Sequence, residues 1–364
     1  MRTDRRLFPH QLTRRDFVRS AASAALASSI VAPRSIAVAA APRRPVTIGQ
    51  GAWTFTLDED WGRLPDGMSY GFGCAVVVDS QDRVYVTSRS ESPCVAVFDK
   101  SGKLLETWSK NFADRVHRTT AQVKATAHGL YRSDEPDGEF LYFPENVDKG
   151  PGDGARAYKT DLSGRVLYEL GKNVRASGDS QPFDFTNPTD VAVAPNGDVY
   201  IVDGYGSQLL YRFDKNFKHL KTIGGPGTEH GKFETCHGVW ISTLRDEPEV
   251  YVADRKNGRV EVFSLDLIYK RTVSDFRAPC CFYQHAGHLY VPELGSRVTV
   301  LDAEDGVAAR LGDGAQVKRR KADLAEHPEV FAAPHALTLD SEGSLYVVEW
   351  LPYGRPRKFR RTPA

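Results

Sequence analysis

One pattern of polar and apolar positions recurs six times along the chain. A turn rich in Asp, Gly, Asn or Glu precedes a short segment in which a tyrosine stands between apolar residues. The six segments are 84–86, 141–143, 199–201, 250–252, 289–291 and 345–347. A further apolar segment precedes most of these turns, as at 75–78, 190–193 and 336–339, and another follows, as at 95–99, 210–214 and 260–263. The pattern predicts short strands in groups, with helices confined to 113–124 and 313–326.

Six such repeats predict an all-β fold, a six-bladed β-propeller. Groups of four short strands that recur every 40 to 50 residues or so are typical of propellers. A two-sheet sandwich with coincidental turn spacing is the alternative. A propeller must close its ring, and the apolar segment 46–55 has no other evident partner. We expect it to join the last blade, built around Tyr346, within a propeller domain that spans residues 41–364.

The first 40 residues have the pattern of an export signal. Thr-Arg-Arg-Asp-Phe-Val-Arg at 13–19 precedes an Ala-rich apolar run at 20–31, and Ala-Val-Ala at 37–39 offers a cleavage site. This resembles a twin-arginine signal peptide, and a disordered basic N-terminus is the alternative. The run is too short for a stable membrane span. We therefore expect a soluble periplasmic or secreted protein that engages the twin-arginine export machinery.

Charge and cysteine content narrow the classes of partner and fold. The formal net charge is +1, which gives no indication of a nucleic-acid partner. The five cysteines form no CxxC pair and have no regular spacing. A protein that folds in a reducing cytosol before export does not depend on disulfides. We expect the cysteines to be buried as small apolar residues.

Three histidines occupy equivalent places in alternate repeats. His128, His237 and His335 each lie where the strand before the turn begins, 109 and 98 residues apart, which is two repeats each time. Blades two, four and six of a sixfold ring are related by about 120°, so three imidazoles converge on the axis. A single histidine at such a place is more often a hydrogen-bonded structural residue. Three of them predict a divalent metal site, with zinc and an open fourth position.

Polar residues follow each tyrosine-centred strand at one face of the ring. An acidic residue stands three places after the tyrosine in five repeats, and its recurrence indicates a structural role in binding loop amides. Arg89, Tyr205 and Arg255 do not recur. Arginines offer planar forks for a carboxylate, and a tyrosine near a dication and arginines has its pKa lowered towards that of a base. Surface salt bridges or ring packing are the alternative roles.

Several motifs resemble one known enzyme family. They are Asn-Pro-Thr-Asp-Val-Ala-Val at 187–193, Val-Asp-Gly-Tyr at 202–205 and Val-Ala-Asp-Arg-Lys-Asn-Gly-Arg-Val at 252–260. Together with the three histidines they resemble the peptidyl-α-hydroxyglycine α-amidating lyase family, within the NHL-repeat six-bladed propellers. The resemblance implies zinc on His128, His237 and His335, Tyr205 as base, and Arg89 and Arg255 in the substrate pocket.

The resemblance also implies a structural calcium ion, from which this chain departs. The family binds calcium through backbone carbonyls equivalent to Val76 and Leu130 and through an Asp directly after the third histidine. Ala336 stands in place of that Asp, so we expect weak calcium binding or none. The family's disulfide cysteines are replaced by Thr186, Gly206, Tyr251 and Val262.

The resemblance thus implies a zinc-dependent lyase for a small-molecule or peptide substrate with a C-terminal carboxylate. It would cleave a carbinolamide N–C bond, releasing an amide and glyoxylate. One alternative is a non-catalytic NHL-repeat propeller that binds a ligand or a protein partner. Another is a different metal-dependent propeller hydrolase, such as one that opens lactones. The fold alone does not decide among these.

Overall fold

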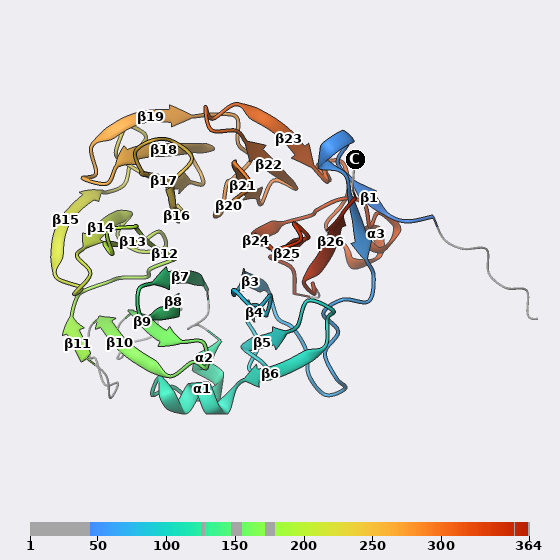
Figure 1. Ribbon diagram of the computed structural model, residues 1–364, viewed down its shortest axis with the longest axis horizontal. Helices are drawn as coiled ribbons and strands as arrows, with labels where there is room; N and C mark the ends of the chain where they lie inside the picture. Colours follow the sequence, from blue (N-terminus) through green and yellow to red (C-terminus); the bar gives the residue numbers. More distant parts are fainter. Residues whose placement is uncertain (1–43, 125–127, 147–154, 172–178, 353, 363–364) are drawn as a thin grey trace, which may run out of the picture. The chain divides into compact units, whose positions relative to one another are not determined.

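Each tyrosine-centred segment forms the second strand of its own sheet in the computed structural model (Figure 1). The structure describes residues 44–364 except 125–127, 147–154, 172–178, 353 and 363–364, and residues 45–364 form one compact unit. The predicted signal peptide at 1–40 lies outside the described residues. Within the described part of the chain the strands form six sheets around a central channel, so the prediction of a six-bladed propeller is confirmed.

The first three sheets follow one another along the chain. The first contains β3 (Gly73–Val78), β4 (Val84–Ser88), β5 (Val95–Phe98) and β6 (Leu104–Trp108). The second contains β7 (Tyr131–Glu135), β8 (Gly138–Pro144), β9 (Arg156–Asp161), β10 (Val166–Gly171) and β11 (Asp179–Pro182), the last parallel to β10. The third contains β12 (Asp190–Val193), β13 (Val199–Val202), β14 (Leu209–Phe213) and β15 (His219–Gly224).

The other three sheets complete the ring. The fourth contains β16 (Cys236–Ser242), β17 (Glu249–Asp254), β18 (Arg259–Ser264) and β19 (Tyr269–Val273). The fifth contains β20 (Tyr283–His285), β21 (His288–Glu293), β22 (Arg297–Leu301) and β23 (Val307–Leu311). The sixth contains β24 (Pro334–Leu339), β25 (Leu345–Glu349), β26 (Arg357–Arg361), β2 (Phe55–Asp58) and β1 (Thr47–Ile48). The first strand of each sheet lies nearest the channel.

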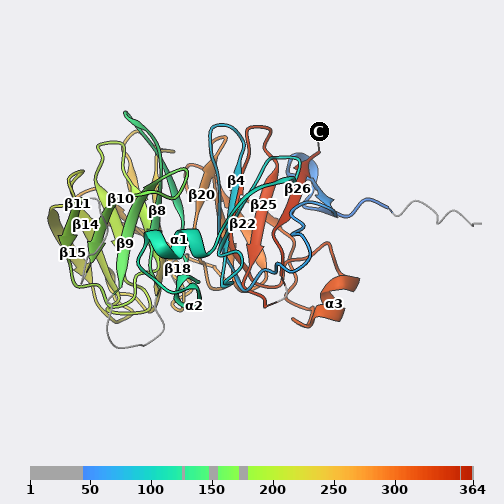
Figure 2. The ribbon, with the colours of Figure 1, turned by 90° about the horizontal axis from the view of Figure 1, so that it is seen from below.

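Short helices occupy connections between the sheets. α1 (Lys110–Arg115) and α2 (Thr120–Val123) follow the first sheet, and α3 (Lys321–Glu326) follows the fifth and lies at one face of the ring (Figure 2). α2 and α3 fall within the two segments for which a helix was expected, and α1 begins three residues before the first of them. Phe112 of α1 packs its ring against Trp108 and Phe143, which holds the apolar side of the helix against the first two sheets. Among the residues that the structure describes, no helix has the length and apolar character needed to cross a membrane.

In the first and sixth sheets the recurrent tyrosine packs in the core and also binds the turn before its strand. Tyr85 and Tyr346 are almost completely buried. Their hydroxyls donate to turn carboxylates, Tyr85 to Asp79 at 3.3 Å and Tyr346 to Asp340 at 2.8 Å. A buried phenol needs a partner for its O–H, and the acidic turn supplies it. In these two sheets the Asp-rich turn and the tyrosine therefore form one structural unit, whereas the hydroxyls of Tyr200 and Tyr251 donate to Leu265 and Asp305 outside their own sheets.

The two ends of the propeller unit meet in the sixth sheet. β2 pairs with β26, with Phe55 opposite Arg361 and Leu57 opposite Phe359. The prediction that the N-terminal segment joins the last blade is confirmed, but its strand boundaries at 46–55 were wrong. Gly49 and Gly51 have positive φ values of 75° and 54°, so the chain turns there into the short helix η1 (Gly51–Trp53) before β2 begins.

This closure generates a prediction about stability. Phe55 has no exposed surface, and it lies in the apolar cluster between the fifth and sixth sheets with Phe331 and Phe359. Phe55→Ala should lower the free energy of unfolding by about 3 kcal/mol or more, since a large buried ring leaves a cavity. Leu57→Ala, at a partly exposed position of the same strand, should have a smaller effect. Urea denaturation followed by circular dichroism measures both, and equal effects would contradict a role of Phe55 in closure.

Candidate metal centre

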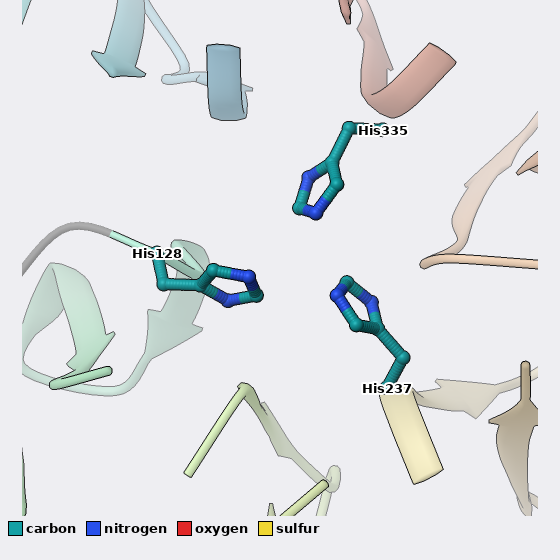
Figure 3. A group of neighbouring side chains, drawn as sticks. All are labelled: His128, His237 and His335. Carbon is teal, nitrogen blue, oxygen red and sulfur yellow. The ribbon is translucent and has the colours of Figure 1, made fainter. Parts of the chain in front are cut away.

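Three imidazoles converge at the centre of the ring (Figure 3). His128 precedes β7, His237 lies in β16 and His335 lies in β24, so they come from the second, fourth and sixth sheets. All three are buried, their ring centroids are 4.8–5.1 Å apart, and one potential ligand atom of each lies within 4.8 Å of the others. The structure therefore brings together the three histidines that the repeat spacing predicted.

Local irregularities in the strands direct two of these side chains. The pairing of β16 with β17 shifts between Cys236 and Gly238, and the pairing of β24 with β25 shifts between Pro334 and Ala336. In each case the histidine is the extra residue of the shift. A bulge of this kind reorients a side chain relative to the regular strand.

Hydrogen bonds to backbone carbonyls determine the tautomer of each imidazole. Nδ1 lies 3.0 Å from the Thr189 oxygen in His128, 2.8 Å from the Cys280 oxygen in His237 and 2.6 Å from the Cys74 oxygen in His335. A carbonyl only accepts, so each Nδ1 carries the proton and each Nε2 presents a lone pair. Every acceptor lies in or just before the first strand of the next sheet in the ring: the third, the fifth and, across the closure, the first.

The Nε2 atoms have the properties of metal ligands. Those of His128 and His335 are buried and have no hydrogen-bond partner among the described residues. A buried nitrogen lone pair without a partner is unfavourable, and a metal ion at the common point would satisfy both. Three imidazoles held by carbonyls through their other nitrogen form a donor set that suits zinc. The residues present therefore fit the predicted ion.

Burial also keeps the imidazoles in the form that binds metals. It lowers the pKa of His128 and of His237 well below the ordinary value, with neighbouring positive groups adding to the effect. Burial lowers the pKa of His335 to about 3. All three rings are therefore neutral near pH 7, with lone pairs free to coordinate.

Two of the recurrent acidic residues hold loops that carry histidines. Glu349 accepts hydrogen bonds from the amides of Ala332 and Ala333 at 2.6 and 3.0 Å, just before His335. Asp254 likewise accepts from the amide of Glu234 at 2.7 Å, just before His237. The prediction that these residues bind loop amides is confirmed. Glu145 differs, since it forms buried ion pairs with Arg118 and Arg156 at 2.6 and 3.1 Å.

Tyr205 and Arg255 lie beside the imidazoles. The Tyr205 hydroxyl is 3.1 Å from Nε2 of His237 and accepts a hydrogen bond from Nη1 of Arg255 at 3.0 Å. The Arg255 guanidinium also lies 5.1 Å from the centre of the Tyr205 ring. Burial raises the pKa of Tyr205, and Arg255 opposes this rise. The protein groups alone therefore do not produce the lowered pKa that the sequence suggested, because burial outweighs the arginine.

Arg89 lies on another side of the centre, with its guanidinium 6.0 Å from the ring centre of Trp350. Its Nη1 donates to the Lys124 and Asn146 carbonyls at 3.0 and 3.2 Å, and its Nη2 donates to the Asn146 side chain. Asn146 in turn donates to Asn187 at 2.6 Å. These bonds hold the guanidinium in place without neutralising its charge.

The sequence analysis missed two side chains at this site. Trp350 lies 5.2 Å from His335 in a near-parallel stack, and Asn146 orients Arg89. Both directly follow the acidic position of their blade, the place that Arg89 and Arg255 occupy in theirs. Comparing that single position across all six repeats would have found them.

A cavity of about 840 Å³ extends from the three histidines along the channel. Its lining includes inner-strand residues and the turns that follow them, such as Asn196 and Gly197, but not Arg89, Tyr205 or Arg255. The histidines begin the first strands and those three residues follow the antiparallel second strands. The cavity and the three polar side chains therefore lie on opposite sides of the imidazoles.

The positions implied for calcium lie in this cavity. Val76, Leu130 and Ala336 all line it. The cavity also contains Asp190, which sequence analysis did not single out; it accepts from the Val239 amide at 3.1 Å, and burial raises its pKa to about 7. The five cysteines are free, and four of them are buried.

Comparison with curated proteins finds relatives of two kinds, while no family model matches the chain. Mouse NHL repeat-containing protein 3 is 30% identical over 58% of this chain and 57% of its own length. The probable peptidyl-α-hydroxyglycine α-amidating lyase of Caenorhabditis elegans is 34% identical over 28% of this chain and 29% of its own length. Peptidyl-α-hydroxyglycine α-amidating lyase 2 of Drosophila melanogaster is 28% identical over 52% of this chain and 45% of its own length. The chain spans less than two thirds of each relative.

Solved structures support the same architecture. A streptogramin B lyase aligns with a TM-score of 0.54, covering 86% of this chain and all of its own at 12% identity, which is evidence for the fold alone. The chain is therefore a six-bladed β-propeller related in sequence to NHL repeat-containing proteins and to peptidyl-α-hydroxyglycine α-amidating lyases.

Proposed function

We propose that the protein is a zinc-dependent lyase that cleaves the N–C bond of a carbinolamide to give an amide and glyoxylate. One observation carries the proposal: three buried imidazoles present their Nε2 atoms to a common point beside a tyrosine and two arginines. The sequence relationship to amidating lyases supports the reaction class. Zinc on the three histidines would polarise the substrate hydroxyl and favour the phenolate form of Tyr205.

The remaining chemistry falls to the side chains around the centre. Tyr205, as a phenolate held by the Arg255 hydrogen bond, accepts the proton of the substrate hydroxyl. The carbon–oxygen double bond of glyoxylate then forms while the carbon–nitrogen bond breaks, and its electron pair goes to nitrogen. Tyr205 returns the proton to that nitrogen, which completes the amide and restores the phenolate. Arg89, with Arg255, binds the substrate carboxylate through charge-assisted hydrogen bonds.

A ligand-binding propeller without catalysis is the second candidate. The mouse NHL repeat-containing protein aligns with more of this chain than either lyase does. A glyoxylate assay separates the candidates, because a binding protein releases none from any α-hydroxyglycine compound. A metal-dependent hydrolase, the third possibility, would instead open lactones.

We also propose that the chain is exported to the periplasm or the medium by the twin-arginine pathway, on the basis of Arg14 and Arg15. Arg14→Lys combined with Arg15→Lys should leave folded protein in the cytoplasm. Fractionation followed by immunoblotting measures this, with the single variant Arg5→Lys as a control outside the motif. Unchanged export of the double variant would exclude this route.

Metal content tests the zinc centre. Protein purified without a histidine tag should contain about one zinc per chain, and Ala at His128, His237 or His335 should remove most of it. His219→Ala, an exposed residue of the outer strand β15, should keep full occupancy as a matched control. Elemental analysis gives the result. Full zinc occupancy in any of the three centre variants would remove that residue from the site.

Tyr205→Phe tests the mechanism. The imidazoles come from other strands, so this variant should keep its zinc and its fold while losing about 100-fold or more of its activity on an α-hydroxyglycine peptide. Arg89→Ala should also lose activity, but by less when the substrate lacks the carboxylate. Glyoxylate release measures both. A Tyr205→Phe variant as active as the wild type would refute the assignment of the base, even if glyoxylate is the product.

A further inference from the structure

Two aromatic rings cover two of the three spaces between neighbouring imidazoles. Tyr205 lies 5.3 Å from the His128 ring and 5.4 Å from that of His237. Trp350 lies 5.2 Å from the His335 ring and 6.2 Å from that of His128. His128 therefore has the phenol on one side and the indole on the other. A ligand at the common point of the Nε2 atoms is flanked by both rings.

The Trp350 ring belongs to a longer apolar wall. Phe72, just before β3, packs against it with centroids 4.9 Å apart and an interplanar angle of 34°. Both side chains are only half-buried, so each leaves part of its surface uncovered. The indole is stacked on His335, and its charged neighbour Arg89 lies over the ring. The wall runs from the candidate metal ligand His335 through Trp350 to Phe72.

In the proposed reaction, one substituent of the substrate has no polar partner and is free to contact this apolar wall. The reacting carbon of a carbinolamide of this kind carries a hydroxyl, a carboxylate and an acylated nitrogen. The hydroxyl requires the metal and Tyr205, and the carboxylate requires an arginine. The acyl group is the one substituent with no polar partner among these residues, and a flat apolar acyl group gains most from stacking on an indole.

We propose that Trp350 and Phe72 form an aromatic subsite that selects substrates whose amide nitrogen carries an aromatic or large apolar acyl group. The inference rests on the proposed function. It identifies the substrate class as N-aroyl-α-hydroxyglycines and α-hydroxyglycine peptides with an aromatic or large apolar residue before the reacting end. Trp350 is the residue that determines this specificity.

A second cluster of aromatic side chains lies on the other side of the imidazoles. It provides a control variant for the test of the Trp350 subsite. Trp240 contacts Tyr131 and Tyr283 with ring centroids 5.5 and 5.8 Å away, and all three line the channel cavity. The observations favour Trp350, because Tyr205 and the arginines lie on the Trp350 side. If the acyl group entered the channel instead, Trp240 would determine the preference.

The experiment compares N-benzoyl-α-hydroxyglycine with N-acetyl-α-hydroxyglycine as substrates of zinc-loaded protein. We expect the wild type to favour the benzoyl compound in kcat/KM by roughly tenfold or more. Trp350→Ala should reduce this ratio to below about threefold, and Trp350→Phe should retain most of it, since a smaller ring still stacks. Trp240→Phe should leave the ratio unchanged. Zinc content, measured in every variant, separates a lost subsite from a lost metal.

A binding measurement keeps this inference separable from the proposed lyase activity. N-Benzoylglycine and N-acetylglycine lack the hydroxyl and cannot react, and calorimetry should show tighter binding of the benzoyl compound through Trp350. That result without glyoxylate release would refute the lyase and support the subsite. Turnover with a ratio that Trp350→Ala does not change would overturn the subsite. A ratio that depends on Trp240 would also overturn it, as would equal binding of the two acylglycines.

Discussion

The hydrogen bonds from imidazole Nδ1 atoms to backbone carbonyls are the interaction on which the centre of this propeller depends. Each bond joins an even-numbered sheet to the next odd-numbered one, through Thr189, Cys280 and Cys74. Because Nδ1 is occupied in this way, Nε2 is left to face the axis as an acceptor. The side chains of the three acceptor residues take no part in these bonds. The orientation of the ligands is therefore a property of how neighbouring sheets pack.

The side chains around the candidate metal centre differ from blade to blade at one position of the repeat. The place after the recurrent acidic residue holds Arg89, Asn146, Arg255 and Trp350 in four of the six blades. Their backbone surroundings are alike, because each follows the second strand of its sheet at the same face. A change of residue type at this one position is thus enough to place a charged, a hydrogen-bonding or an aromatic side chain at a given point around the axis. The acids beside Arg255 and Trp350 hold the loops before His237 and His335, so in these two blades the constant and the variable positions have separate tasks.

The sequence was sufficient to predict the sheets and the convergence of the histidines. The tyrosine-centred strands follow from the local pattern of polar and apolar residues. Histidines two repeats apart in a ring of six blades must lie about 120° apart around the axis. The bulges at His237 and His335 were not predictable, because they depend on pairing with β17 and β25. The contact of Trp350 with His335 depends on where side chains point within the assembled ring. The pKa of Tyr205 is raised by partial burial in the folded ring, although the residue keeps 37% of its surface exposed, and no local pattern records this burial.

The bond between His335 and Cys74 joins residues 261 positions apart, across the place where the ring closes. The first blade is synthesised before most of the sixth, so the Cys74 carbonyl is present before its donor, Nδ1 of His335. Until the last blade docks between the fifth and the first, only two imidazoles have neighbours that orient them. The third imidazole of the centre therefore has its carbonyl acceptor only when the sixth sheet lies against the first.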